Sequence, residues 1–260
     1  MSDQVPTQAG GAPPERESAR EGPHVRRRWD WLRRLAAARR LLRAASAFLV
    51  GLVAFGVLAV LAKANAYFSW DRSVARAVQA IPVPGMETLM RVVSFPGDGV
   101  TSWVFVGAAL LFFFARGRRS EGFGLLLSAA GGPVLNRVVK QMVGRPRPTM
   151  EHVRVSGQWA YESFPSGHVT FYVCFFGFLF FVAFALLPKG SARRRVVCGL
   201  AALPVLLVGL SRVYLGAHWP SDTLGAYLLS GAWLAFSLDM YRRWKHRATF
   251  HPEEEVAGDK

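Results

Sequence analysis

Long runs of apolar residues, separated by short polar segments, occupy the sequence from about residue 45 to residue 241. A bilayer core about 30 Å thick needs about 20 apolar residues in a helix that rises about 1.5 Å per residue. Six runs approach that length. The pattern therefore predicts an all-α membrane bundle of six transmembrane helices, at residues 45–65, 98–115, 121–140, 167–187, 196–215 and 222–241.

The third run changes character in its second half, where small and polar residues replace the large apolar ones. These residues are Gly131, Gly132, Pro133, Asn136 and Arg137. We therefore expect the outer half of this helix to be kinked and packed inside the bundle. An ionisable residue at membrane depth is a functional candidate, so Arg137 is expected either to act in the site or to be paired within the bundle.

The polar segments suggest a division of the chain. Residues 1–25 are rich in Gly, Pro, Ser, Gln and Glu and are expected to form a disordered cytoplasmic tail. Residues 26–43 mix arginines with tryptophans and leucines, which suits either a basic helix on anionic headgroups or a simple topology anchor. Residues 44–243 form the predicted six-span domain, with short interfacial helices between 71 and 98, and residues 244–260 form a second cytoplasmic tail.

Composition agrees with a membrane protein, since 52% of the residues are hydrophobic and the mean hydropathy is +0.21. A formal net charge of +15 could indicate a nucleic-acid partner. The arginines, however, lie in short clusters between apolar runs, so we expect membrane lipids as partners and no nucleic acid. The two cysteines, Cys174 and Cys198, lie in apolar runs and are expected to be buried filler, without a disulfide framework or a cysteine-based metal site.

The basic clusters also predict the orientation, because Lys and Arg are retained on the cytoplasmic side of short loops. They fall at residues 26–43, 116–119, 189–195 and 242–247. The prediction is a multi-pass plasma membrane protein with both termini in the cytoplasm. The remaining loops would then be extracytoplasmic.

Polar residues gather in three stretches near the predicted outer ends of the helices. They are Lys140, Arg147 and Pro148; Pro165, Ser166, Gly167 and His168; and Ser211, Arg212, His218 and Asp222. All three stretches project to one face of the membrane. Orientation by loop charges does not explain basic residues on the extracytoplasmic side. Their presence there therefore indicates a functional site.

These residue types suit phosphoryl transfer, which needs cations for the phosphate oxygens, a nucleophile in line and an acid for the leaving oxygen. Lys140, Arg147 and Arg212 are expected to surround a phosphate. Ser166 and Gly167 open the fourth span, so their backbone N–H groups are expected to point outward at a helix N-terminus, which is a ready anion site.

Two histidines are candidates for the chemical steps. A turn could bring the Asp222 carboxylate onto one imidazole nitrogen of His218 and leave the other nitrogen free to attack phosphorus. His168 would protonate the leaving oxygen and then activate water. His152 and His251 lie in no comparable pattern and are not expected to be catalytic. Arg145 lies two residues from Arg147 and could compete for the phosphate, but we expect it to be a headgroup contact or a solvated charge.

Several aromatic residues surround these stretches: Trp159, Tyr161, Phe164, Tyr214 and Trp219. They are expected either to line the path of a lipid chain or to form part of an interfacial aromatic belt. Small residues of the last run, at 225, 226, 230 and 231, could pack helices within or between chains, so the oligomeric state is left open.

The three patterns K-x6-R-P, P-S-G-H and S-R-x5-H-x3-D, in this order, resemble the signature motifs of the type 2 phosphatidic acid phosphatase superfamily. The resemblance extends over roughly residues 45–241. It implies a six-span helical bundle and dephosphorylation of lipid phosphates or diphosphates without a metal or other cofactor. It also implies that His218 is the nucleophile and His168 the acid.

The sequence therefore predicts a lipid phosphatase that acts at the outer membrane face through a phosphohistidine, with undecaprenyl diphosphate as the first candidate substrate. A phosphatase for phosphatidic acid or phosphatidylglycerophosphate is the nearest alternative, because the motifs describe only the phosphate site. The same residues would also suit a membrane protein that binds anions without catalysis, or an enzyme that transfers phosphate to an acceptor different from water.

Overall fold

The computed structural model describes residues 23–250, and every regular element in this part of the chain is a helix. The elements are α1 (Pro23–Ala64), α2 (Ser69–Gln79), α3 (Met86–Ser94), the 3-10 helix η1 (Phe95–Gly97), α4 (Gly99–Ala115), α5 (Arg119–Val143), α6 (Gly167–Leu186), α7 (Ala192–Tyr214) and α8 (Pro220–Phe250). The predicted all-α class is confirmed. The chain divides into two units between Ala47 and Phe48, and the bundle belongs to the second unit.

Four of the described helices are long and apolar enough to cross a membrane, namely Ala45–Ala64 within α1, α5, α6 and α7. A fifth candidate is the pair formed by Met86–Gly97 and Gly99–Ala115, which is bent by 56° at Asp98 and counts as one span if the two halves are taken together. The sixth predicted span, 222–241, lies inside α8, which is not among these candidates. The polar residues Ser230, Ser237 and Asp239 interrupt its apolar sequence, so α8 is less apolar than its neighbours.

The single helix α1 covers both the predicted basic helix at 26–43 and the first predicted span. The position of residues 26–43 on a membrane surface stays a prediction. Of the predicted tails, residues 1–22 and 251–260 lie outside the described residues, whereas 244–250 belong to α8. From Phe48 onward α1 exposes large apolar side chains such as Leu49, Val53 and Val57, as expected of a lipid-facing helix.

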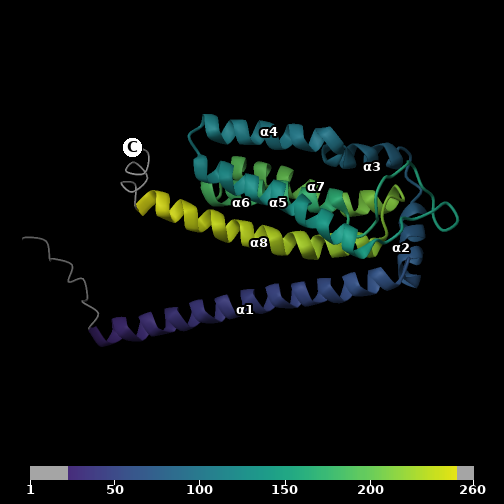
Figure 1. Cartoon of the computed structure of the whole chain (residues 1–260). Coiled ribbons are helices and arrows are strands. Elements are labelled where there is room, and N and C mark those ends of the chain that lie inside the picture. Colours follow the sequence, from purple (N-terminus) through teal and green to yellow (C-terminus); the bar gives the residue numbers. More distant parts are fainter. Residues whose placement is uncertain (1–22, 251–260) are drawn as a thin grey trace, which may run out of the picture. The chain divides into compact units, whose positions relative to one another are not determined.

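The centre of the bundle is α6, which packs against α5, α7 and α8 (Figure 1). It is apolar around its whole circumference, which is the pattern of a buried helix, and Val169, Tyr172 and Phe178 are fully buried in it. On α5, a Cβ atom at Gly131 would collide with Trp233, and one at Gly132 would collide with the sulfur of Cys174. One face of this part of α5 is therefore closely packed, as expected, whereas Val134 and Val138 on its other face are exposed. The helix continues through Pro133, and the expected kink stays a prediction.

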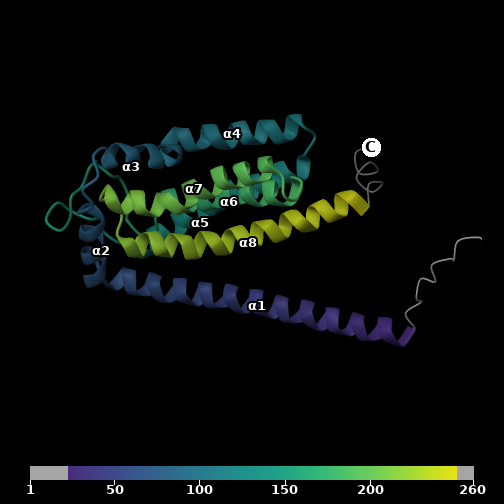
Figure 2. The same cartoon turned by 180° about the vertical axis from the view of Figure 1, so that it is seen from behind.

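One end of the bundle gathers the elements that carry the three motif stretches. The connection between α5 and α6, the short helices α2 and α3, and the first turns of α6 and α8 all lie there (Figures 1 and 2). The opposite end carries the turns between α4 and α5 and between α6 and α7, together with the last turns of α8. The predicted short helices between 71 and 98 are thus found as α2 and α3, beside the candidate site.

Candidate active site

The turn between α7 and α8 brings the two halves of the third motif close together. Gly216 has φ +69, and a Cβ atom there would collide with the carbonyl oxygen of Arg154, so this position requires glycine. The backbone N–H groups of Ala217 and His218 both donate to the carbonyl of Arg212, at 3.0 and 3.3 Å. The chain therefore reverses within a few residues, and α8 begins at Pro220, which is favourable at a first helical position.

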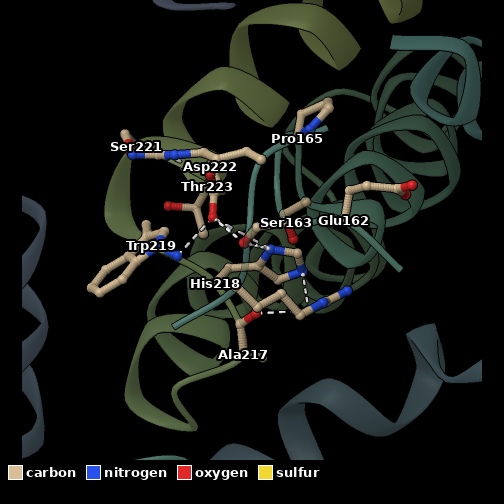
Figure 3. A network of polar contacts seen from close by, with 12 residues as sticks. Glu162, Ser163, Pro165, Ala217, His218, Trp219, Ser221, Asp222 and Thr223 are labelled. Atoms are coloured by element: carbon tan, nitrogen blue, oxygen red, sulfur yellow. Dashed lines mark hydrogen bonds and ion pairs between the residues drawn. The ribbon is translucent and has the colours of Figure 1, made fainter. Parts of the chain in front are cut away.

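The His218 imidazole lies at the centre of the polar network shown in Figure 3. Its Nδ1 atom is 3.7 Å from Asp222 Oδ2 and 3.4 Å from the Ser163 hydroxyl oxygen, and its Nε2 atom is 3.4 Å from Nη1 of Arg147. The Ser163 hydroxyl donates to Asp222 Oδ2 at 2.5 Å. The carboxylate thus lies on the expected side of the ring, but Ser163, which lies in none of the three motifs, lies closer to the ring.

The electrostatic surroundings keep His218 uncharged. The ring is 2% exposed, and Arg147, Lys140 and Arg212 are all close enough to repel a second proton. Burial first, and these cations second, hold the pKa of His218 well below its usual value of 6.5. A neutral imidazole has a lone pair on one nitrogen, so it can act as a nucleophile at neutral pH.

Two of the predicted phosphate ligands also organise the loop between α5 and α6. Lys140 donates from Nζ to the carbonyl oxygens of Glu162 and Ser163, at 2.6 and 3.2 Å. Arg147 donates from Nη1 to the carbonyl of Ala217 at 2.7 Å and is partly exposed beside His218. Both cations therefore face the imidazole and fix the backbone around it, while Pro148, the last residue of this motif, is buried.

Arg212 and Ser166 have polar atoms that are not satisfied by the described residues. The Arg212 guanidinium donates from Nη1 to Ser94 Oγ at 3.1 Å and stacks on Trp159 at 4.4 Å, but its buried Nε has no hydrogen-bond partner there. The buried hydroxyl of Ser166 has none either. Buried donors are normally paired, so these two groups are suited to an anionic ligand.

The helix N-terminus at α6 differs in one respect from the expectation. The backbone N–H of Ser166 donates to the carbonyl of Asp222 at 3.2 Å, so it does not point outward. The reason is that the loop before α6 is tied to the first turn of α8. Gly167 is exposed at this N-terminus, as the anion site requires.

His168 projects from the first turn of α6 and is bound by a residue outside the motifs. Its Nε2 atom lies 2.8 Å from Oδ1 of Asp98, which sits at the break between η1 and α4. Asp98 is not among the site residues predicted from the sequence. The signal that could have identified Asp98 is its position, as an acidic residue, at the start of an apolar run.

The prediction for Arg145 was wrong. Its side chain is fully buried and donates to Asp222 Oδ1 at 2.7 Å, to Asp71 Oδ2 at 2.9 Å and to the Ser221 hydroxyl. Asp71, from α2, also accepts the backbone N–H of Ser221. Arg145 is buried because these two carboxylates, from α2 and α8, converge on it beneath the His218 turn.

The remaining expected residues lie at the edge of the site or away from it. Arg137 is exposed and lies over the Tyr161 ring, at 4.4 Å. His152 contacts the rings of Tyr67 and Trp219, which agrees with a structural role. Of the aromatic residues expected to line a lipid path or a belt, Phe164, Tyr214 and Trp219 are buried in the protein, whereas Tyr161 is 71% exposed. Among the side chains that the structure describes, no three His, Cys, Asp or Glu residues are placed to hold a metal ion.

The fold and the site together define a multi-pass helical membrane protein with a buried neutral histidine surrounded by cations. Comparison with known proteins agrees with this class. The profile of the PAP2 superfamily matches residues 121–246, which include all three motif stretches. Phosphatidylglycerophosphatase B of Bacillus subtilis is 30% identical over 179 residues, which are 67% of this chain and 85% of that protein.

Further relatives differ in the substrates that their names state. A lipid A 1-phosphatase of Rhizobium johnstonii is 33% identical over 162 residues, covering 54% of this chain and 62% of the relative. An undecaprenyl-diphosphatase of Sulfolobus acidocaldarius is 30% identical over 140 residues, covering 52% and 60%. The crystal structure of the Bacillus subtilis PAP2-type phosphatidylglycerolphosphate phosphatase superposes with a TM-score of 0.63 at 26% identity, over 75% of this chain and 96% of that one.

This chain belongs to the PAP2 superfamily, and it is a membrane phosphatase of that superfamily. The resemblance read from the motifs is therefore confirmed.

Proposed function

We propose that this phosphatase removes phosphate from a membrane lipid phosphate or diphosphate through a phosphohistidine formed on His218. The observation that supports this most directly is the buried, neutral imidazole with Arg147 at Nε2 and with Asp222 and Ser163 at Nδ1. A lone pair on Nε2 would attack phosphorus, and the bond from phosphorus to the lipid oxygen would break. The Asp222 carboxylate would stabilise the positive charge that develops on the ring.

His168 would supply the proton that the departing lipid oxygen needs. It would then remove a proton from water, whose oxygen attacks phosphorus while the bond from nitrogen to phosphorus breaks. Lys140, Arg147 and Arg212 would neutralise the phosphate oxygens throughout, so that the reaction needs no metal ion. Activity in detergent should therefore persist in excess EDTA, and loss of activity that added divalent ions restore would contradict this part of the proposal.

For the lipid, phosphatidylglycerophosphate is the first candidate, since the phosphatidylglycerophosphatase B of Bacillus subtilis is similar over most of its length in sequence and structure. Undecaprenyl diphosphate is the second candidate. It is supported by the Sulfolobus relative and by the basic segments 116–119 and 189–195, which lie at the end of the bundle opposite the site and favour an outward-facing site.

The test is a substrate panel with the purified full chain and the His218→Ala variant side by side. Wild type should release phosphate from at least one of phosphatidylglycerophosphate, phosphatidic acid and undecaprenyl diphosphate, and the variant should lose about 10³-fold or more of this rate. His246→Ala, at the far end of α8, is the matched control and should keep the wild-type rate. Unchanged turnover in His218→Ala would exclude the phosphohistidine, and no release from any lipid would exclude the lipid phosphatase.

A further inference from the structure

We infer that Asp98 is a positioning residue for His168, fixing the ring so that its second nitrogen delivers the proton to the leaving oxygen. This inference rests on the proposed function. It assigns a task to the segment between α3 and α4, residues 95–98, which contributes none of the three motifs. The connection is the 2.8 Å contact between Asp98 Oδ1 and His168 Nε2.

Asp98 occupies a position where an aspartate would be expected to cap a helix. It is the residue immediately before α4, where an aspartate side chain usually accepts a hydrogen bond from the first turn of the helix. Its side chain makes no such capping bond. The carboxylate is directed to His168 instead, so helix capping does not account for an acidic residue here.

Gly97 allows the backbone of this segment to lie against the histidine ring. A Cβ atom at Gly97 would be 2.7 Å from Cδ2 of His168 and 2.8 Å from a ring carbon of Tyr172. The Tyr172 hydroxyl in turn donates to the carbonyl of Val93, which ties the end of α3 to α6. The segment therefore meets the His168 ring at Gly97 and at Asp98, and the orientation of the imidazole is fixed by packing as well as by the carboxylate.

The Asp98 carboxylate also affects the protonation of His168, because the other charges near this ring are positive. The remaining charged groups that act on this ring are the guanidinium groups of Arg212 and Arg147, and both disfavour a protonated imidazole. Asp98 is the anion among these neighbours. A proton can leave Nδ1 only when both ring nitrogens carry one, and Asp98, which accepts Nε2–H, stabilises this imidazolium form against the two guanidinium groups. After the proton on Nδ1 has passed to the leaving lipid oxygen, the ring is neutral with Nε2–H, and Asp98 keeps its negative charge throughout.

The experiment compares leaving groups. An alkoxide leaving from a lipid phosphate needs a proton, whereas p-nitrophenolate leaves without one. For Asp98→Asn in the full-length protein, kcat/KM should fall about tenfold or more with the lipid phosphate and change much less with p-nitrophenyl phosphate, because kcat/KM reports only steps up to departure of the leaving group. Asp98→Glu should recover part of the loss.

Two matched variants separate positioning from structure. Gly97→Ala should show the same preference for the good leaving group, because its methyl group displaces the His168 ring. Gly107→Ala, on α4 with open space around it, should match wild type with both substrates. Equal losses with both substrates in Asp98→Asn, or no loss with either, would overturn the inference. A wild-type protein that hydrolyses neither a lipid phosphate nor a lipid diphosphate would instead overturn the proposed function.

Discussion

At the scale of single residues, the Arg145 guanidinium compensates the charges of two buried carboxylates next to the His218 turn. Asp71 and Asp222 are both fully buried, and Arg145 binds an oxygen of each. Replacing one partner of a buried ion pair typically costs about 3–5 kcal/mol, because the remaining charges are left without compensation. Arg145→Met should therefore lower the thermal stability of the protein in detergent strongly and should also reduce phosphate release.

The double variant Asp71→Asn with Arg145→Met provides the control for this prediction. It removes one of the two stranded carboxylates, so it should be more stable than Arg145→Met alone. Arg243→Met removes an exposed i,i+4 pair with Asp239 and should change the stability by less than about 1 kcal/mol. If Arg145→Met were as mild as Arg243→Met, the buried network would not stabilise the site.

His218 gives a prediction about pH at the same scale. Burial and the neighbouring cations hold its folded-state pKa well below 6.5, the value expected in the unfolded chain. Below pH 6.5 the unfolded chain therefore binds a proton that the folded chain does not, and stability is lost as the pH falls, by at most about 1.4 kcal/mol per pH unit. The stability of wild type relative to His218→Gln, measured by thermal unfolding in detergent, should decrease from pH 7 to pH 5. Parallel pH profiles would show that His218 titrates normally.

At the scale of secondary-structure elements, the helices were predictable because each follows from a continuous apolar run. The predicted spans at 121–140 and 167–187 overlap α5 and α6 almost completely. The partners of the catalytic residues were not predictable in this way. Ser163, Asp98 and Asp71 belong to none of the three motifs, and their contacts join positions 59, 70 and 150 residues apart. Such pairs arise only when the helix ends meet in the folded bundle.

The turn between α7 and α8 is the element whose geometry matters most for the nucleophile. Gly216→Ala should cost at least about 1–2 kcal/mol for the left-handed conformation alone, and its methyl group would also collide with the Arg154 carbonyl. We expect lower thermal stability and a large loss of phosphate release, because His218 follows two residues later. Gly199→Ala, on an open face of α7, is the matched control and should be neutral or slightly stabilising. Full activity in Gly216→Ala would mean that this turn tolerates rearrangement.

At the scale of the whole bundle, the charged residues at the two ends differ in their partners and in their surroundings. At one end, Glu121 joins the first turn of α5 to the last turns of α8. Its carboxylate pairs with Lys245 at 2.5 Å and with Arg118 at 3.5 Å. At the opposite end, Lys140 and Arg212 are buried around the site and bind backbone carbonyls or a hydroxyl, while the exposed Arg76 and Arg91 donate to the backbone carbonyls of His152 and Ser156. Solvated loop charges are the ones that set orientation during insertion, so the end with Glu121 is the expected cytoplasmic end.

This orientation can be measured with single cysteines in a background where Cys174 and Cys198 are replaced by serine. Gln158 lies exposed in the loop between α5 and α6, and Lys189 lies exposed in the turn between α6 and α7, at opposite ends of the bundle. A membrane-impermeant maleimide should label Gln158→Cys in intact cells and should label Lys189→Cys only after permeabilisation. The reverse pattern would place the site in the cytoplasm, where lipid phosphates of the inner leaflet, and not a carrier lipid released outside, would be the substrates within its reach.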